Sequence, residues 1–348
     1  MTLPKYKFLA QTLRKELLGG VYHSGDALPT EQTLARSYAC SRQTVRQAIA
    51  LLENEGLIVR RQGSGTYAAP PPAPAARSVH VITTYITDYI FPFIVRGIER
   101  SLSAASCRMT LSATYNHVEQ ERMLLKQILD APPDGLIIEG TKTALDNPNL
   151  FLYQEIARRG IPCVFINGVY PQLEGAVSVL MDDREGGRMA ARYLVQHGAK
   201  RLAGIFKSDD LQGVLRCEGF TQEAAALGMP VDKKDLVFFS TETKTALIAG
   251  GAGIPPCEKG LGLCCYNDEI ALRAVRSWAA AGEYDSHQLV SFDQSALAQL
   301  STPPLHSLGH AKEALGQQAA QKLLSLIAGN SEQSVSLPWT PIANEEDK

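Results

Sequence analysis

The sequence has no long hydrophobic run. No window approaches the roughly 20 consecutive apolar residues that a membrane-spanning helix needs. The first residues, Met1 to Lys7, also lack the apolar core and cleavage site of a secretory signal. We therefore expect a protein that stays in the cytoplasm.

The cysteines follow no metal-binding pattern. None of the seven cysteines belongs to a C-x-x-C motif, none is joined to a spaced pair of histidines, and their number is odd. These features argue against a zinc knuckle and against a disulfide framework. We expect reduced, mostly buried thiols at Cys40, Cys107, Cys163, Cys217, Cys257, Cys264 and Cys265.

The familiar catalytic motifs are also missing. The chain has no G-x-S-x-G elbow, no G-x-x-x-x-G-K phosphate loop and no metal-spaced set among its seven histidines. The glycine-rich stretch at 250–253 follows no clear strand, which favours a loop over a phosphate cradle. Paired carboxylates in a cleft could hydrolyse a glycoside, but acyl, phosphoryl and hydride chemistry each lack their residues. We expect no enzyme, no catalytic residue, no cofactor and no metal.

Charge is distributed unevenly along the chain. The 348 residues carry a formal net charge of −2, but residues 1–76 hold nine basic and five acidic side chains, a net charge of +4. The remainder therefore carries −6. This asymmetry indicates a small basic module joined to a larger acidic one.

An uncharged stretch rich in proline and alanine separates the two charge zones. It runs over 68–76 and cannot form a helix or a strand ladder, so it predicts a semi-rigid spacer. Since a single core rarely grows beyond about 250–300 residues, two or three domains are expected. We predict one domain over 1–68, a linker over 69–77 and a second domain over 78–345.

The first domain has the element pattern of a winged helix. Apolar spacing predicts a helix over 6–18, Thr30 is a candidate cap for a second helix, and Ser41 is a candidate cap for a third. The remaining elements are a strand over 56–61, a glycine turn over 62–65 and a return strand at 66–67.

The third helix carries the candidate chemistry. Val45, Ala48, Ile49 and Leu52 share one face at 100° per residue, while Gln43, Arg46 and Gln47 point away from it. Arginine pairs with guanine and glutamine with adenine in the major groove of DNA, which a helix fits. A merely solvated charged face is the alternative.

Five stretches resemble the GntR-type winged-helix repressors, in order and over nearly the whole first domain. They are GDALPTE (25–31), LA (34–35), SRQTVRQA (41–48), GLI (56–58) and GSGTY (63–67). The resemblance implies a winged helix-turn-helix (α+β) that binds double-stranded DNA. The contacts it implies come from Lys5, Tyr6, Thr30, Glu31, Arg42, Gln43, Thr44, Arg46, Gln62, Gly63 and Ser64.

The second domain alternates strands with helices. Eight strands are predicted, at 79–84, 109–114, 135–138, 163–166, 202–206, 236–239, 263–266 and 289–292, with helices between them. This alternation predicts an α/β domain with two parallel sheets covered by helices. In such sheets ligands bind beyond the carboxyl ends of the strands.

Polar and aromatic residues gather at these strand ends, a set that suits a sugar. We expect sugar contacts from Tyr89, Phe91, Glu139, Lys142 and Lys207. Asp183, Asp268 and His310 are further candidates, although an aspartate at 183, 209 or 268 could instead cap a helix. An isolated histidine such as His310 is more often an ordinary core or surface residue.

The second domain also resembles the sugar-sensing core of LacI/GalR-type regulators, a two-lobed fold related to periplasmic binding proteins. The matching stretches are DDREGG (182–187), GAKRLA (198–203), RCEGF (216–220), NDEIAL (267–272) and VSFDQS (290–295). This resemblance implies sugar contacts from Asn167, Arg216, Asn267 and Asp293, with Arg216 as the main hydroxyl clamp.

The combination of both domains is similar to that of bacterial arabinose-operon repressors. The similarity is clearest at VITTYITDYIFP (81–92), TKTAL (141–145), GIFKSDDLQG (204–213) and CYNDEIAL (265–272). It implies a homodimeric repressor of sugar utilisation genes that L-arabinose releases from a palindromic operator. The alternatives are a different sugar or sugar phosphate as effector, and a sugar-binding protein without a repressor role.

Overall fold

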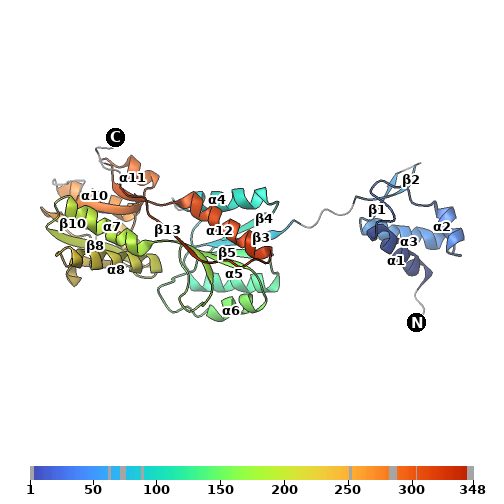
Figure 1. The fold of residues 1–348 in the computed structure, drawn as a ribbon, viewed down its shortest axis with the longest axis horizontal. Coiled ribbons are helices and arrows are strands. Elements are labelled where there is room, and N and C mark those ends of the chain that lie inside the picture. The colour runs from blue at the N-terminus through green and yellow to red at the C-terminus, as the bar shows by residue number, and fades with distance from the viewer. Residues whose placement is uncertain are drawn as a thin grey trace. The chain divides into compact units, whose positions relative to one another are not determined.

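The computed structural model describes residues 4–61, 64–70, 76–87, 90–250, 253–281, 288–302 and 304–342. The chain separates into two compact units, Met1–Ala76 and Arg77–Lys348 (Figure 1). Within the described ranges, no helix is both long and apolar enough to cross a membrane. The seven cysteines are buried or half-buried.

The first unit is a winged helix, as its sequence predicts. The side chain of Thr30 accepts the amide of Thr33 at the start of α2, and Ser41 accepts the amide of Thr44 at the start of α3, so both predicted caps are confirmed. Leu13, Val45 and Leu52 are fully buried between the helices. The elements are α1 (Lys5–Leu18), α2 (Glu31–Ser37), α3 (Arg42–Asn54) and the antiparallel pair β1 (Ile58–Arg61) and β2 (Gly65–Ala68).

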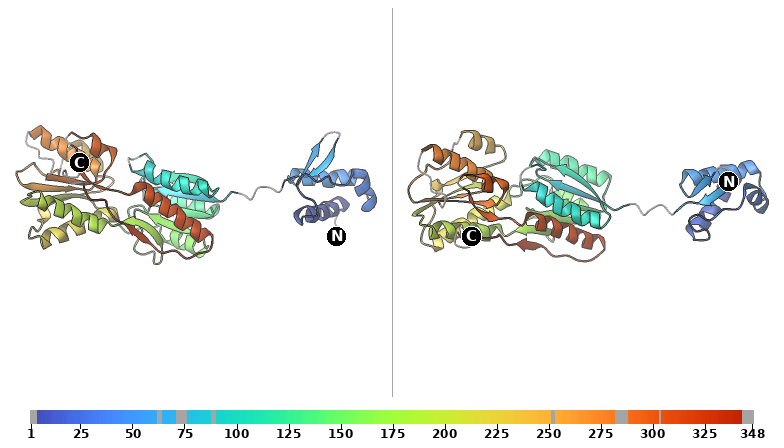
Figure 2. Two further views of the ribbon diagram at one scale, coloured as in Figure 1. Left: turned by 45° about the horizontal axis from the view of Figure 1, so that its top comes forward. Right: turned by 90° about the horizontal axis from the view of Figure 1, so that it is seen from above.

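The second unit contains two lobes, each built on a parallel sheet, which confirms the predicted α/β class. Lobe 1 has strand order β13-β7-β6-β5-β3-β4. Helices α4 and α12 cover one face of this sheet and α5 and α6 the other (Figures 1 and 2). Its elements are β3 (Ser78–Thr83), α4 (Phe91–Ala104), β4 (Arg108–Ala113), α5 (Val118–Asp130), β5 (Gly135–Ile138), α6 (Leu150–Arg158), β6 (Cys163–Ile166), β7 (Val177–Met181), α12 (Lys312–Ile327) and β13 (Val335–Leu337).

Lobe 2 has strand order β12-β11-β10-β8-β9. Helices α7 and α8 pack on one face, and α10 contributes the fully buried Trp278 to the core on the other. Its elements are α7 (Asp183–Gln196), β8 (Arg201–Lys207), α8 (Leu211–Ala226), the 3-10 helix η1 (Lys233–Asp235), β9 (Leu236–Phe239), α9 (Lys244–Gly250), β10 (Leu261–Cys265), α10 (Asp268–Ala281), β11 (Leu289–Asp293), α11 (Ala296–Leu300) and β12 (His306–Gly309).

The sequence pattern missed three strands, β7, β12 and β13. Two of them are short, and all three mix serine with apolar residues, so they lack a continuous apolar run. Only part of the predicted glycine loop at 250–253 lies within the described residues. Gly250 ends α9, and Gly251 and Ala252 lie outside the described residues.

Within the described residues, the chain passes between the lobes three times. It crosses at Asp182 between β7 and α7, at His310 between β12 and α12, and at Trp339 beyond β13. The crossings are tied together, because Gly309 and Thr340 exchange two backbone hydrogen bonds of 2.8 and 2.9 Å. These crossings place the carboxyl ends of both sheets around one space.

Each lobe brings two helices into close contact through glycine. In lobe 2, a Cβ added at Gly219 of α8 would lie 1.9 Å from the carbonyl oxygen of Arg184, and one at Gly187 of α7 would lie 2.1 Å from that of Arg216. Gly97 and Gly316 play the same part between α4 and α12 of lobe 1. The close α7–α8 approach fixes Arg216 relative to α7.

We predict that Gly219→Ala destabilises lobe 2, because the methyl group would collide with backbone that cannot move alone. The free energy of unfolding should fall by about 1–3 kcal/mol in urea titrations followed by circular dichroism. Gln222→Ala, at an exposed position of the same helix, is the control. Equal stability of the two variants would contradict the close-packing argument.

Candidate functional site

The exposed face of α3 in the first unit presents the polar residues that the sequence predicts. Arg42, Gln43 and Arg46 are exposed, while the apolar face is at most 1% exposed. The predicted division of the helix into two faces is therefore confirmed. The exposed side chains supply the hydrogen-bond donors and acceptors that base edges require.

Contacts within the first unit hold several candidate DNA-binding residues. The Nε atom of Arg46 lies 2.9 Å from a carboxylate oxygen of Glu31, which joins α3 to α2. Lys5 donates to the carbonyl of Ala39 at 3.2 Å, and Tyr6 packs against the core. Thr30 caps α2 with its hydroxyl. These five residues, Lys5, Tyr6, Thr30, Glu31 and Arg46, therefore also stabilise the unit.

Both strands of the wing and Ser64 of its turn lie within the described residues. The Ser64 hydroxyl lies 2.6 Å from the hydroxyl of Tyr67, which also donates to the Ser64 carbonyl at 3.0 Å. The guanidinium of Arg61 lies 4.8 Å from the centre of the Tyr67 ring. Gln62 and Gly63 lie outside the described residues.

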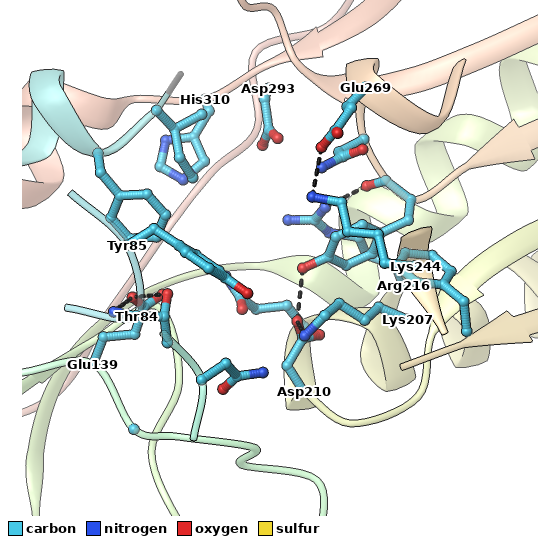
Figure 3. Close-up of a pocket in the computed structure, with 18 residues that line it drawn as sticks. Thr84, Tyr85, Glu139, Lys207, Asp210, Arg216, Lys244, Glu269, Asp293 and His310 are labelled. Atoms are coloured by element: carbon cyan, nitrogen blue, oxygen red, sulfur yellow. Dashed lines mark hydrogen bonds and ion pairs between the residues drawn. The ribbon is translucent and has the colours of Figure 1, made fainter. Parts of the chain in front are cut away.

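A pocket lies between the two lobes of the second unit, with an empty volume of about 800 Å³ that is partly open to solvent. Side chains from both lobes face this space (Figure 3). Small-molecule sites occur preferentially at such interfaces, so the place of this pocket suits a small ligand. The lining residues are Thr84, Tyr85, Ile90, Phe91, Asn116, Glu139, Gly140, Lys207, Asp210, Gln212, Arg216, Phe239, Lys244, Tyr266, Asn267, Glu269, Asp293 and His310.

Most of the candidate sugar-binding residues meet at this pocket. Those that line it are Phe91, Glu139, Lys207, Arg216, Asn267, Asp293 and His310. Asn167, Asp183, Asp268 and Lys142 are not among the lining residues, and each contacts another residue instead. Tyr89 lies outside the described residues.

Arg216 is the central cation of the pocket. Its Nε atom lies 2.8 Å from Asp183, with both side chains 3% exposed, and its Nη1 atom donates to the Tyr266 carbonyl at 2.6 Å. Burial by itself lowers the pKa of Arg216, but the charges of Asp183 and Asp293 outweigh it and raise that pKa. The guanidinium therefore stays charged.

Aromatic rings surround the same guanidinium. Its central carbon lies 4.5 Å from the ring centre of Phe292, 4.8 Å from that of Trp339 and 5.0 Å from that of Tyr266. Such contacts favour a cation and restrict its orientation. Together with Asp183, which pairs with Arg216 but does not line the pocket, the rings fix the orientation of the guanidinium.

Lys207 and Lys244 also have carboxylate partners. Lys207 lies 2.7 Å from Asp209 and 3.0 Å from Asp210, and Lys244 lies 2.6 Å from Glu269. Burial by itself lowers the pKa of Lys207, but the charges of Asp210 and Asp209 raise it by more. The net shift of the pKa is upward, so the ammonium remains charged. Each cation among the described lining residues is thus already neutralised.

Glu139 and His310 supply polar groups with different character. Glu139 accepts hydrogen bonds from the backbone amide of Thr84 and from Asn167, at 2.7 and 2.9 Å, and burial raises its pKa. Burial lowers the pKa of His310 to about 3, so its imidazole is neutral. Both ring nitrogens of His310 are buried without a hydrogen-bond partner.

The sequence left open that Asp183, Asp209 or Asp268 caps a helix. In the structure the capping residue is an immediate neighbour of each one. The side chains that cap α7 and α8 are Asp182 and Asp210, and Asn267 accepts the amide of Ile270 at the start of α10. The capping alternative is therefore wrong at all three positions. Asp209 instead accepts from Thr241, and Asp268 accepts from the hydroxyls of Ser291, Ser295 and Ser307.

Several lining residues were not chosen from the sequence. Tyr85, Asp210 and Glu269 lie in the same strand-end stretches as the chosen residues, so that signal was present. Asn116 follows the predicted strand 109–114 by two residues, so its strand-end place was also visible in the sequence. Gln212 and Lys244 lie on helices α8 and α9, where no strand-end signal marks them. The rest of this group are Thr84, Ile90, Gly140, Phe239 and Tyr266.

Comparison with known proteins agrees with both units. Residues 5–68 match the family described as bacterial regulatory proteins, gntR family, and residues 191–343 match the periplasmic binding protein-like domain. The arabinose metabolism transcriptional repressor of Geobacillus stearothermophilus is 36% identical, covering 95% of this chain and 93% of its own length. The repressor of the same name from Halalkalibacterium halodurans is 34% identical, covering 93% and 89%.

A solved structure agrees with the fold of the two lobes. The structure of a putative ribose operon repressor from Burkholderia thailandensis matches with a TM-score of 0.63 at 23% identity, covering 75% of this chain and 97% of its own. The resemblance to GntR-type and LacI/GalR-type regulators is thereby confirmed. The chain belongs to the family of bacterial transcriptional repressors that join a gntR-family DNA-binding domain to a periplasmic-binding-protein-like domain.

Proposed function

We propose that this protein represses sugar utilisation genes and that L-arabinose, bound in the pocket between the lobes, releases it from operator DNA. The observation that carries the proposal is the Arg216–Asp183 pair, which aims a fixed guanidinium into a pocket edged by Glu139, Asn267 and Asp293. The arabinose repressors that share more than a third of their residues over most of the chain support it.

The pocket offers what a pentose requires. Arginine, amide and carboxylate groups bind pairs of neighbouring hydroxyls, and the neutral His310 can donate to one group and accept from another. Tyr85, Phe91 and Tyr266 add aromatic surface for the C–H face of the ring. These side chains are our proposed sugar contacts.

The charge balance of the pocket favours an uncharged sugar over a sugar phosphate. The three cations among its described lining residues each have a carboxylate partner, and Glu139 and Asp293 add negative charge. A phosphate would have to displace one of these carboxylates. The alternative effectors are therefore other uncharged sugars.

The first unit supplies the DNA contacts in this proposal. Its net charge of +4 favours the phosphate backbone, and α3 would enter the major groove with Arg42, Gln43 and Arg46 toward the bases. The remaining proposed contacts are Lys5, Tyr6, Thr30, Glu31, Thr44, Gln62, Gly63 and Ser64. Two copies in a homodimer would occupy the half-sites of a palindromic operator.

Release requires the sugar to prefer the state that does not bind DNA. A sugar that bound both states equally well would shift nothing, so the difference must amount to about 1–3 kcal/mol or more. Sugar that holds the two lobes together would provide such a preference. A sugar-binding protein without a repressor role would leave the gntR-family unit unexplained.

We expect L-arabinose to release the full-length protein from DNA that the sugar-free protein selects from a random-sequence library. Fluorescence anisotropy of the labelled DNA measures the release, and calorimetry with the same protein measures sugar affinity. L-arabinose 5-phosphate should neither bind nor release. Release by another sugar and none by L-arabinose would contradict the effector assignment.

We predict that Arg42→Ala and Arg46→Ala each weaken operator binding by about 1–3 kcal/mol through lost base contacts. Because the first unit folds around its own core, sugar affinity measured by calorimetry should not change. Gln47→Ala, on the same exposed face, is the comparison variant. Unchanged operator affinity in both arginine variants would remove α3 as the recognition helix.

A further inference from the structure

A group of contacts joins the two lobes beside the pocket. Asn116 donates from its side-chain amide to the hydroxyl of Thr241 at 2.6 Å, and the ammonium of Lys142 pairs with Glu242. The backbone amide of Leu211 donates to the hydroxyl of Thr143 at 3.0 Å. Three loop residues of lobe 1 thus bind lobe 2 directly.

The lobe 1 side of these contacts is held in an unusual backbone conformation. Asn116 and Lys142 have φ angles of +57° and +49°, in the left-handed region. Asparagine tolerates this region, but lysine visits it rarely. The Lys142 amide donates to the Asn116 side-chain carbonyl at 2.8 Å, so the two loops support each other.

A buried polar network inside lobe 1 also holds the loop that contains Lys142. The carboxylate of Glu121 is 1% exposed and accepts the hydroxyls of Tyr153 and Tyr170 at 2.7 and 2.6 Å. The Tyr170 hydroxyl in turn accepts the amide of Thr141, the residue before Lys142, at 2.7 Å. The loop is therefore organised within lobe 1 before lobe 2 contacts it.

The lobe 2 side connects the contacts to the pocket wall. The Thr241 hydroxyl donates to Asp209 at 2.7 Å, and Asp209 pairs with Lys207, which lines the pocket. Leu211 is the first residue of α8, where a helix has no internal partner for its amide. Lobe 1 supplies that partner through Thr143.

We infer that Lys142, Asn116 and Thr143 form an inter-lobe clasp that sets how readily the two lobes close around the sugar. In this inference Lys142 is a positioning residue and not a sugar contact, unlike the expectation drawn from its strand-end place. The effect on sugar affinity rests on the proposed function, whereas the effect on lobe closure does not.

Lys142→Met and Glu242→Gln test the clasp by its effect on sugar affinity. Each should weaken L-arabinose affinity in calorimetry about two- to fivefold, the range of a partly exposed ion pair. The double exchange Lys142→Glu with Glu242→Lys should restore affinity. Lys322→Met, which breaks a lysine–glutamate pair of similar lysine exposure inside lobe 1, should leave affinity unchanged.

Hydrogen exchange tests the clasp without sugar. In the sugar-free full-length protein, Lys142→Met should speed exchange of the Leu211 amide severalfold, because opened lobes expose that amide to water. The Lys322→Met variant should leave it unchanged. Faster exchange supports the clasp even if L-arabinose proves not to be the effector.

Two results would overturn the inference. Loss of affinity in Lys142→Met with none in Glu242→Gln would make Lys142 a direct sugar contact. Unchanged exchange of the Leu211 amide in Lys142→Met would show that the pair does not hold the lobes together.

Discussion

The buried ion pair between Arg216 and Asp183 is the interaction on which the pocket depends. Both side chains are 3% exposed, and removing one partner of such a pair costs about 3–5 kcal/mol because the other charge stays buried. Gly187 and Gly219 let α7 and α8, the two helices that carry this pair, approach closely. The ring of Trp339, on a chain crossing between the lobes, packs against the same guanidinium. Arg216 therefore contacts both the pocket and a chain segment that crosses between the lobes.

The first unit and the pocket of the second unit differ in their balance of charge. The first unit has an excess of cations and an exposed polar helix face, which suits the phosphates and base edges of DNA. In the pocket of the second unit, Lys207, Arg216 and Lys244 are each neutralised by a neighbouring carboxylate. The exposed face of α3 and the pocket therefore differ in charge, one suited to a polyanion and the other to an uncharged ligand.

Much of the fold could be predicted from apolar patterning, and less of the site. The uniformly apolar strand Gly135–Ile138 has its predicted ends, whereas Val335–Leu337 is too short to leave a pattern. The strand ends pointed to the pocket, but a turn decides which of two adjacent residues caps the helix, as at Asp209 and Asp210. The partner of Lys142 is 100 residues away and only the tertiary fold brings it close.

The proposed function requires that ligand binding in the pocket between the lobes be coupled to DNA binding by the first unit. Coupling between two binding equilibria is reciprocal, so operator DNA must weaken sugar binding by the factor by which sugar weakens operator binding. The most direct measurement is the calorimetric affinity of the full-length protein for L-arabinose, with and without saturating operator DNA. We predict a weaker affinity with DNA, by the factor found in the anisotropy titration. Equal affinities would contradict the proposed coupling between sugar binding and DNA binding.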